Sequence, residues 1–204
     1  MAKPSGSPVS KLLHVPARGS HGHYQAIKRV LKVIDSLHGD GQFRPTQINV
    51  TKQTGYSGVI RVSSSGPIEI EVTEICSDPE FTAAHEIGHL LDVVGIDPDS
   101  LVFADQQNKD DLSGVFSAIM ATDTYRGLRE MGIEYYLDPA ELWARAYSQW
   151  ITLRSGDETL RKQLEATRAY DDDWLGCQTQ WPEDEFEPIA ETIDDLMQKL
   201  GWQK

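Results

Sequence analysis

Cysteine is scarce in this 204-residue chain, which has only Cys76 and Cys177, far apart in the sequence. Metal sites and redox motifs built on thiols place two cysteines close together, as in Cys-x-x-Cys, so such a site is not indicated. Two free thiols are the simpler expectation, and one disulfide between the two residues stays open.

The sequence also lacks any long apolar run. No segment near the N-terminus has the apolar stretch of a signal peptide, and none later reaches the roughly 20 apolar residues that cross a membrane. We therefore expect a cytoplasmic protein with no membrane partner, while export by a route that the sequence does not show stays open.

Basic residues are in the minority, with 19 Lys and Arg against 32 Asp and Glu and a net charge of −13. Such a surface repels the phosphate backbone of nucleic acids and the anionic surface of a membrane. Nucleic-acid binding is therefore not expected as the main task.

What the chain does have is the composition of a globular protein, 39% apolar and 25% charged, with enough apolar residues for a core. Its length suits one domain with terminal extensions. We expect a mobile tail over residues 1–22, rich in Pro, Gly and Ser, and a main domain over 23–170. An acidic extension over 171–204 should end in a helix that packs on the same domain.

Hydrophobic periodicity predicts an α+β fold in which one helix and three strands precede a helical C-terminal half. Ile70 and Val72 alternate with Glu69 and Glu71, so one face of the last strand should be buried and the other wet. The three strands are predicted to form a small, mostly antiparallel meander. The expected strands are 47–50, 58–62 and 68–72, the expected helices are 24–37, 79–94, 113–131, 139–153, 157–169 and 185–200, and residues 96–112 are expected to form a loop.

The motif His85-Glu86-Ile87-Gly88-His89 lies within the predicted helix 79–94. Histidines four residues apart share one face of a helix and can bind one cation, for which Zn²⁺ is the natural candidate. Zinc lowers the pKa of a bound water, and Glu86 can then act as the general base that takes its proton. The motif therefore predicts hydrolysis through a metal-activated water.

A catalytic zinc of this kind needs a third protein ligand. The position ten residues after His85 holds Gly95, which excludes the pattern His-Glu-x-x-His-x-x-Gly-x-x-His. The strongest candidate is Glu141, in the first turn of a later helix, where the small Ala144 would allow close approach to the histidine helix. Glu141 could instead complete a capping box or pair with Arg145. Other candidate ligands are Glu130, Glu134, Asp110 and Asp111.

His85-Glu86-Ile87-Gly88-His89, followed far downstream by Glu141-Leu142-Trp143-Ala144-Arg145-Ala146, resembles the gluzincin class of zinc metallopeptidases. More narrowly, it is similar to the anthrax lethal-factor-like metallopeptidases and to relatives encoded in phages and toxin systems. The resemblance covers about residues 24–155. It implies a zincin-like fold, zinc held by His85, His89 and Glu141, and cleavage of a peptide bond in a protein substrate.

The resemblance also implies a tyrosine shortly before the third ligand, whose hydroxyl stabilises the oxyanion. Tyr135 and Tyr136 are both candidates, and the sequence does not choose between them. Asp92 is a candidate partner for a ligand imidazole. The strand 68–72, or the one before it, could offer an edge to an extended peptide.

Three other functions stay open, and one of them is hydrolysis of a non-peptide amide bond. Regulatory metallopeptidases that cleave a repressor carry a similar motif, although usually with a shorter gap before the third ligand than the one between His89 and Glu141. A binding or assembly module could keep the zincin fold without catalysis, although a structural zinc site has no use for Glu86. The sequence does not indicate the oligomeric state.

Overall fold

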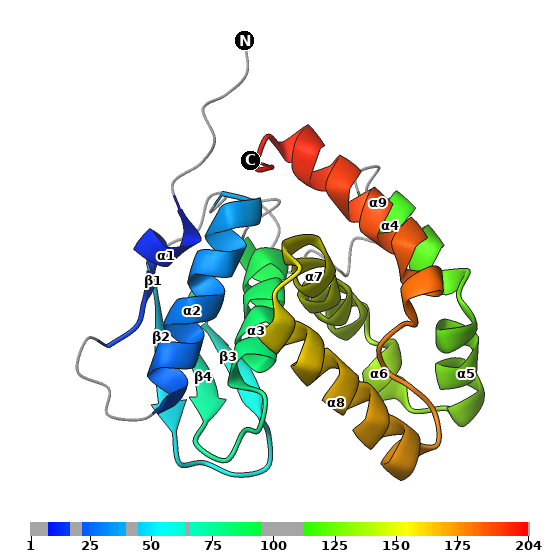
Figure 1. Cartoon of the computed structure of the whole chain (residues 1–204), viewed down its shortest axis with the longest axis horizontal. Coiled ribbons are helices and arrows are strands. Elements are labelled where there is room, and N and C mark those ends of the chain that lie inside the picture. The colour runs from blue at the N-terminus through cyan, green and yellow to red at the C-terminus, as the bar shows by residue number, and fades with distance from the viewer. Residues whose placement is uncertain (1–7, 17–21, 40–44, 64–65, 95–111, 204) are drawn as a thin grey trace.

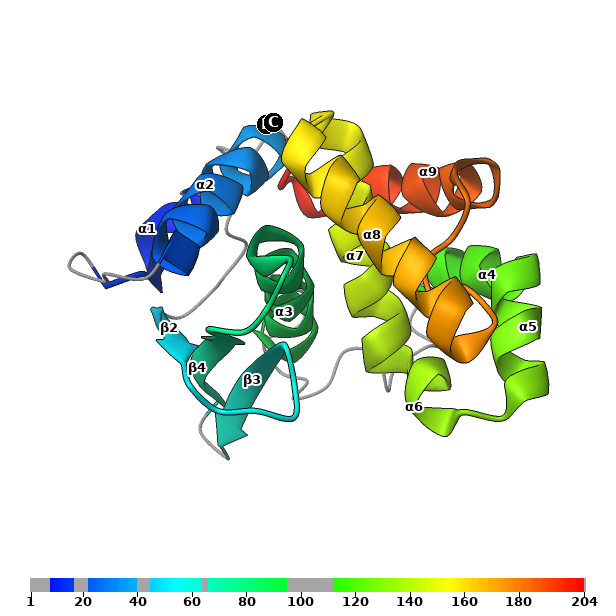
Figure 2. The same cartoon turned by 60° about the horizontal axis from the view of Figure 1, so that its bottom comes forward.

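The computed structural model describes residues 8–16, 22–39, 45–63, 66–94 and 112–203 (Figure 1). A small sheet and the helices α2 (Gly22–Leu37) and α3 (Pro79–Val94) form one half of the molecule. The other half is helical, and Figure 2 shows α3 lying between the sheet and this second half. The predicted α+β class is confirmed.

The sheet has four strands in the order β1-β2-β4-β3, so that β3 (Gly58–Ser63) lies at an edge. Three strands run parallel to one another: β1 (Leu13–His14), β2 (Thr46–Thr51) and β4 (Gly66–Thr73). The edge strand β3 is antiparallel to β4. The prediction of a mostly antiparallel meander is wrong. The segment 52–57 crosses the end of β4, so that β3 lies on the side of β4 opposite to β2. At the crossing, the backbone N–H of Thr73 donates to the Ser57 carbonyl.

One face of β4 is buried as predicted, but the other is not wet along its whole length. Ile70 and Val72 are fully buried, and Glu71 on the opposite face is buried as well. Arg61 donates two hydrogen bonds to the Glu71 carboxylate, at 3.1 and 2.9 Å, and the hydroxyl of Tyr56 donates a third at 2.6 Å. A buried charge is tolerated here because it is paired and hydrogen-bonded.

The predicted mobile tail is too long. Residues 9–14 form helix α1 (Val9–Leu12) and strand β1, and they bury Val9 and Leu13 in the core. The short strand pairs with β2, so this segment belongs to the sheet.

The C-terminal half follows the predicted helices with three differences, one of which is the short helix α6 (Glu134–Leu137), which was not predicted. Helix α4 (Ser113–Met120) and helix α5 (Asp123–Met131) replace one predicted helix, because Thr122 caps α5 by accepting from the Tyr125 N–H. Helix α8 (Glu158–Leu175) continues through Asp171, so the predicted boundary at residue 171 falls inside a helix. The remaining helices are α7 (Pro139–Ser155) and α9 (Glu183–Leu200).

Helix α7 is the centre of the molecule. All residues from Leu142 to Thr152 are buried, and the helix packs against α3, α8 and α9. A Cβ at Gly88 of α3 would lie 2.9 Å from the Ala144 Cα, so the two helix backbones approach closely at small residues. The indole N–H of Trp143 donates to the Gly88 carbonyl at 3.0 Å, which fixes the register of this contact.

Within the part of the chain that the structure describes, no helix combines the length and the apolar character that a membrane span requires. Neither cysteine forms a disulfide, and Cys76 is buried while Cys177 is half-buried.

Candidate metal centre

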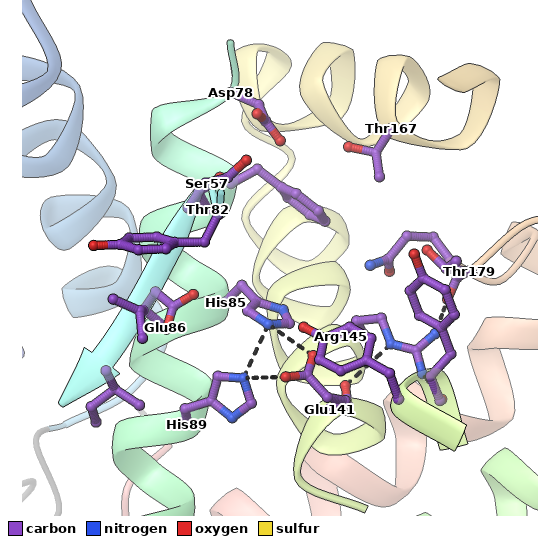
Figure 3. Close-up of a pocket in the computed structure, with 18 of the residues that line it drawn as sticks. Ser57, Asp78, Thr82, His85, Glu86, His89, Glu141, Arg145, Thr167 and Thr179 are labelled. Atoms are coloured by element: carbon purple, nitrogen blue, oxygen red, sulfur yellow. Dashed lines mark hydrogen bonds and ion pairs between the residues drawn. The ribbon is translucent and has the colours of Figure 1, made fainter. Parts of the chain in front are cut away.

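His85 and His89 share one face of α3, as their spacing predicts, and this face is turned toward α7 (Figure 3). Their Nε2 atoms are 3.1 Å apart. Pro79 begins this helix, and buried residues on its other faces, including Ala84, Ile87 and Leu91, fix its orientation. The two imidazoles are thereby held together at the junction of the two halves of the molecule.

Glu141 enters this junction from the first turn of α7. Its Oε2 lies 3.4 Å from the His85 Nε2, and its Oε1 lies 3.3 Å from the His89 Nε2. Asp138 caps the helix by accepting from the Ala140 N–H, so Glu141 is not needed for capping. Nor does its carboxylate pair with Arg145, whose Nε donates to the Glu141 backbone carbonyl.

The donor set fits a zinc ion. Two imidazoles and one carboxylate are the ligands of many catalytic zinc sites, and in a tetrahedral site with zinc–nitrogen distances of about 2.0–2.1 Å the donors lie about 3.3 Å apart. The separations of 3.1, 3.3 and 3.4 Å match that spacing. Among the described residues, His85, His89 and Glu141 are the group of acidic, histidine or cysteine side chains whose donors converge closely enough to hold a metal.

The pKa values of the three groups reflect the same proximity. Burial would raise the pKa of Glu141, but hydrogen bonds from His85 and His89 lower it well below its ordinary value. Burial lowers the pKa of His85. Burial would also lower the pKa of His89, but the carboxylates of Glu141, Glu86 and Asp92 together raise it. The Glu141 carboxylate is thus held ionised, the form that binds a metal.

Glu86 faces the edge strand beside the histidines and is only 5% exposed. Burial raises its pKa to about 7, although a hydrogen bond from the backbone of Ile60 in β3 opposes the shift. A carboxyl group with this pKa both accepts and releases a proton near neutral pH.

The structure distinguishes the two candidate tyrosines. Tyr135 lies beside Glu141. The pKa of the Tyr135 phenol is raised, chiefly by partial burial and further by the negative charge of Glu141 and the hydrogen bond to that carboxylate. Tyr136 instead packs its ring against Arg145, whose guanidinium carbon is 5.6 Å from the ring centroid. Tyr135 is therefore the better-placed hydroxyl, while Tyr136 forms part of the wall.

Arg145 has a role that the sequence did not reveal. Its side chain is buried, and it donates to the backbone carbonyls of Glu141, Thr179 and Tyr136. It thereby joins α7 to α6 and to the segment between α8 and α9. Burial lowers the pKa of this guanidinium to about 10, so it stays protonated at neutral pH.

These groups line one cleft of about 800 Å³ between the sheet edge and the C-terminal helices. Residues 55–60 form one wall, α3 forms the floor, and the opposite wall comes from α6, α7, Thr167 of α8 and the segment at Thr179 and Gln180. Figure 3 shows Thr167 directed into this space from α8. A cleft bordered by a strand edge can accept an extended chain.

The other candidates from the sequence fall outside the cluster. Glu130 and Glu134 are exposed, and Asp110 and Asp111 lie outside the described residues. Asp92 is buried one turn beyond His89 and acts on it by charge. The predicted strand 68–72 belongs to β4, which lies between β2 and β3 and has no free edge. Of the two strands predicted to offer an edge to a peptide, only β3 therefore has one.

Comparison with known proteins adds no relative: no protein-family model matches the chain, and no curated protein or solved structure matches it significantly. The function must therefore be argued from the geometry of the cleft.

Proposed function

We propose that this chain is a zinc-dependent endopeptidase of the zincin type. The observation that carries the proposal is the convergence of His85, His89 and Glu141 beside a second buried carboxylate, Glu86, that is not part of the ligand group. A structural zinc site is usually closed by four protein ligands, whereas three ligands and a free carboxylate are typical of hydrolysis.

His85, His89 and Glu141 would hold the ion. When bound there, zinc supplies Lewis-acid chemistry, since it polarises a carbonyl group and lowers the pKa of water. Proton transfer, oxyanion stabilisation and substrate binding fall to groups of this chain.

Glu86 takes up the proton of the attacking water and delivers it to the leaving amine. The carboxylate thus acts first as a base and then as an acid, and burial, which raises its pKa, favours the uptake of a proton. The backbone of Ile60 and the close contact with Gly58 hold the carboxylate in place.

Tyr135 would donate a hydrogen bond to the oxyanion that forms on the substrate carbonyl. The free edge of β3 would bind the substrate as an added antiparallel strand, because a strand edge offers unpaired N–H and C=O groups. Protection of the β3 amides from hydrogen exchange upon binding of a peptide would test this role, and unchanged exchange would contradict it.

The metal content of purified protein tests the proposal. Wild type and Glu86→Gln should retain about one zinc per chain in elemental analysis, whereas His85→Ala and Glu141→Ala should lose it or bind it weakly. A wild-type protein that holds no zinc and cannot be loaded with it would overturn the proposal.

A second measurement separates catalysis from binding. Wild type loaded with zinc should cleave members of a peptide library, and Glu86→Gln should lower the rate by at least about 100-fold. Zinc binding without any cleavage would instead favour a non-catalytic binding module.

A further inference from the structure

Helix α8 carries a row of side chains that leads away from the cleft. Thr167 lines the cleft, and Tyr170 and Trp174 follow it at intervals of three and seven residues, which places all three on one face of the helix. The wall that Thr167 begins is therefore continued by two aromatic rings.

These two rings are exposed and ordered against each other. Tyr170 is 62% and Trp174 69% exposed, and their rings stack at a centroid distance of 6.2 Å with planes 19° apart. The other tryptophans, Trp143, Trp150, Trp181 and Trp202, are all buried. A large apolar surface left in water beside a cleft is a mark of a contact surface.

The surroundings of the two rings are negatively charged, which favours a cationic ligand. Asp173 is exposed between them in the sequence, and the last turn of α8 contains no basic residue. The carbonyl groups at a helix C-terminus add negative potential, and the whole chain carries a net charge of −13. A cation is attracted to the face of Trp and Tyr rings, and more so next to a carboxylate.

We propose that Tyr170 and Trp174 form an extension of the cleft that binds a lysine or arginine side chain of a flexible protein substrate. This inference rests on the proposed peptidase function, and it narrows the substrate to an extended segment with a basic residue. Seven residues of helix span about 10 Å, which an extended chain covers in about three residues. The basic residue would therefore lie about three positions beyond the residue that passes Thr167.

Binding can be measured without cleavage, in the full-length Glu86→Gln variant. The probes are two fluorescently labelled 14-residue peptides of Gly and Ser, one with four Lys and one with four Glu, and the readout is fluorescence anisotropy. The Lys peptide should bind and the Glu peptide should not. Trp174→Ala should weaken binding of the Lys peptide on the order of fivefold, and Tyr170→Ala somewhat less.

Matched variants separate this surface from general attraction. Ile75 is also exposed, at 72%, so Ile75→Ala removes a similar apolar group elsewhere and should leave binding unchanged. Asp173→Asn should weaken binding, whereas Asp184→Asn, which removes the same charge at an exposed position of α9, should have less effect.

No binding of the Lys peptide, or equal binding by Trp174→Ala and Ile75→Ala, would overturn the inference. Fluorescence anisotropy depends on neither zinc content nor turnover. A failure of this inference can therefore be distinguished from a failure of the peptidase proposal. Circular dichroism of each variant would verify folding, which exposed positions should not disturb.

Discussion

Gly58 of the edge strand lies directly against the carboxylate of Glu86 on α3. A Cβ at position 58 would be 2.7 Å from the Glu86 Oε1 and 2.6 Å from the Thr82 Cγ2, closer than real Cβ contacts. Only glycine allows this approach, so the strand that borders the cleft also positions the candidate general base.

Gly58→Ala should therefore displace Glu86 while leaving His85, His89 and Glu141 in place. We expect normal zinc content and a rate of peptide cleavage lower by about 100-fold, since small misplacements of a reacting group have effects of this size. Gly127→Ala is the control, because a Cβ at Gly127 meets nothing within 4 Å. An unchanged rate for Gly58→Ala would show that the contact does not position the base.

Gly88→Ala should displace the proposed metal ligands through the contact between α3 and α7. The added Cβ would be 2.9 Å from the Ala144 backbone and 3.1 Å from the Tyr147 ring, so the two helices must separate. We expect a loss of about 1–3 kcal/mol in the free energy of unfolding and weaker zinc binding, measured by urea denaturation and chelator competition. Loss of stability without any change in zinc affinity would contradict the link between this contact and the site.

Arg145→Lys should loosen the wall of the cleft although it keeps the charge. One ammonium group cannot reach the three carbonyls of Glu141, Thr179 and Tyr136 in the geometry of a guanidinium. We expect a loss of about 2–3 kcal/mol in stability and faster hydrogen exchange around Thr179. Arg126→Lys at an exposed position should cost less than about 0.5 kcal/mol, and an equal effect of both variants would refute a specific role for Arg145.

The pH dependence of stability should contain a contribution from Glu71. Hydrogen bonds from Arg61 lower the pKa of this carboxyl, so its ionised form favours the folded state. The contribution is present above the ordinary pKa of glutamate, about 4.3, and is lost as the pH falls through the lowered value. Glu71→Gln should be less stable than wild type at pH 7, and the difference should shrink below about pH 4.

Denaturation from pH 7 to pH 3 would measure this effect, with Glu130→Gln at an exposed position as the control. A difference between wild type and Glu71→Gln that stayed constant over this range would exclude the ion pair as its source.

The sequence predicted the parts of the site that depend on local patterns. Helix α3 begins at Pro79 as expected, and the spacing of His85 and His89 alone places both on one face. Glu141 was predicted as a third ligand because a catalytic zinc site needs one and because Ala144 is small, and the close contact of Ala144 with Gly88 is present.

Features that depend on contacts between distant segments could not be predicted in this way. The order of the strands is decided by where residues 52–57 cross the end of β4, and strand periodicity carries no such information. The short elements α1 and β1 were missed because their order comes from the burial of Val9 and Leu13 rather than from propensity. The role of Arg145 depends on carbonyls contributed by three segments.

The burial of α7 has a mechanical consequence for the cleft. Because every residue from Leu142 to Thr152 is buried, we expect the backbone of α7 that carries Glu141 to open rarely. Tyr135 and Tyr136 belong to α6, a single short turn with no buried residue. If a peptide binds in the cleft, we expect the wall formed by α6 to adjust around it while His85, His89 and Glu141 hold their positions.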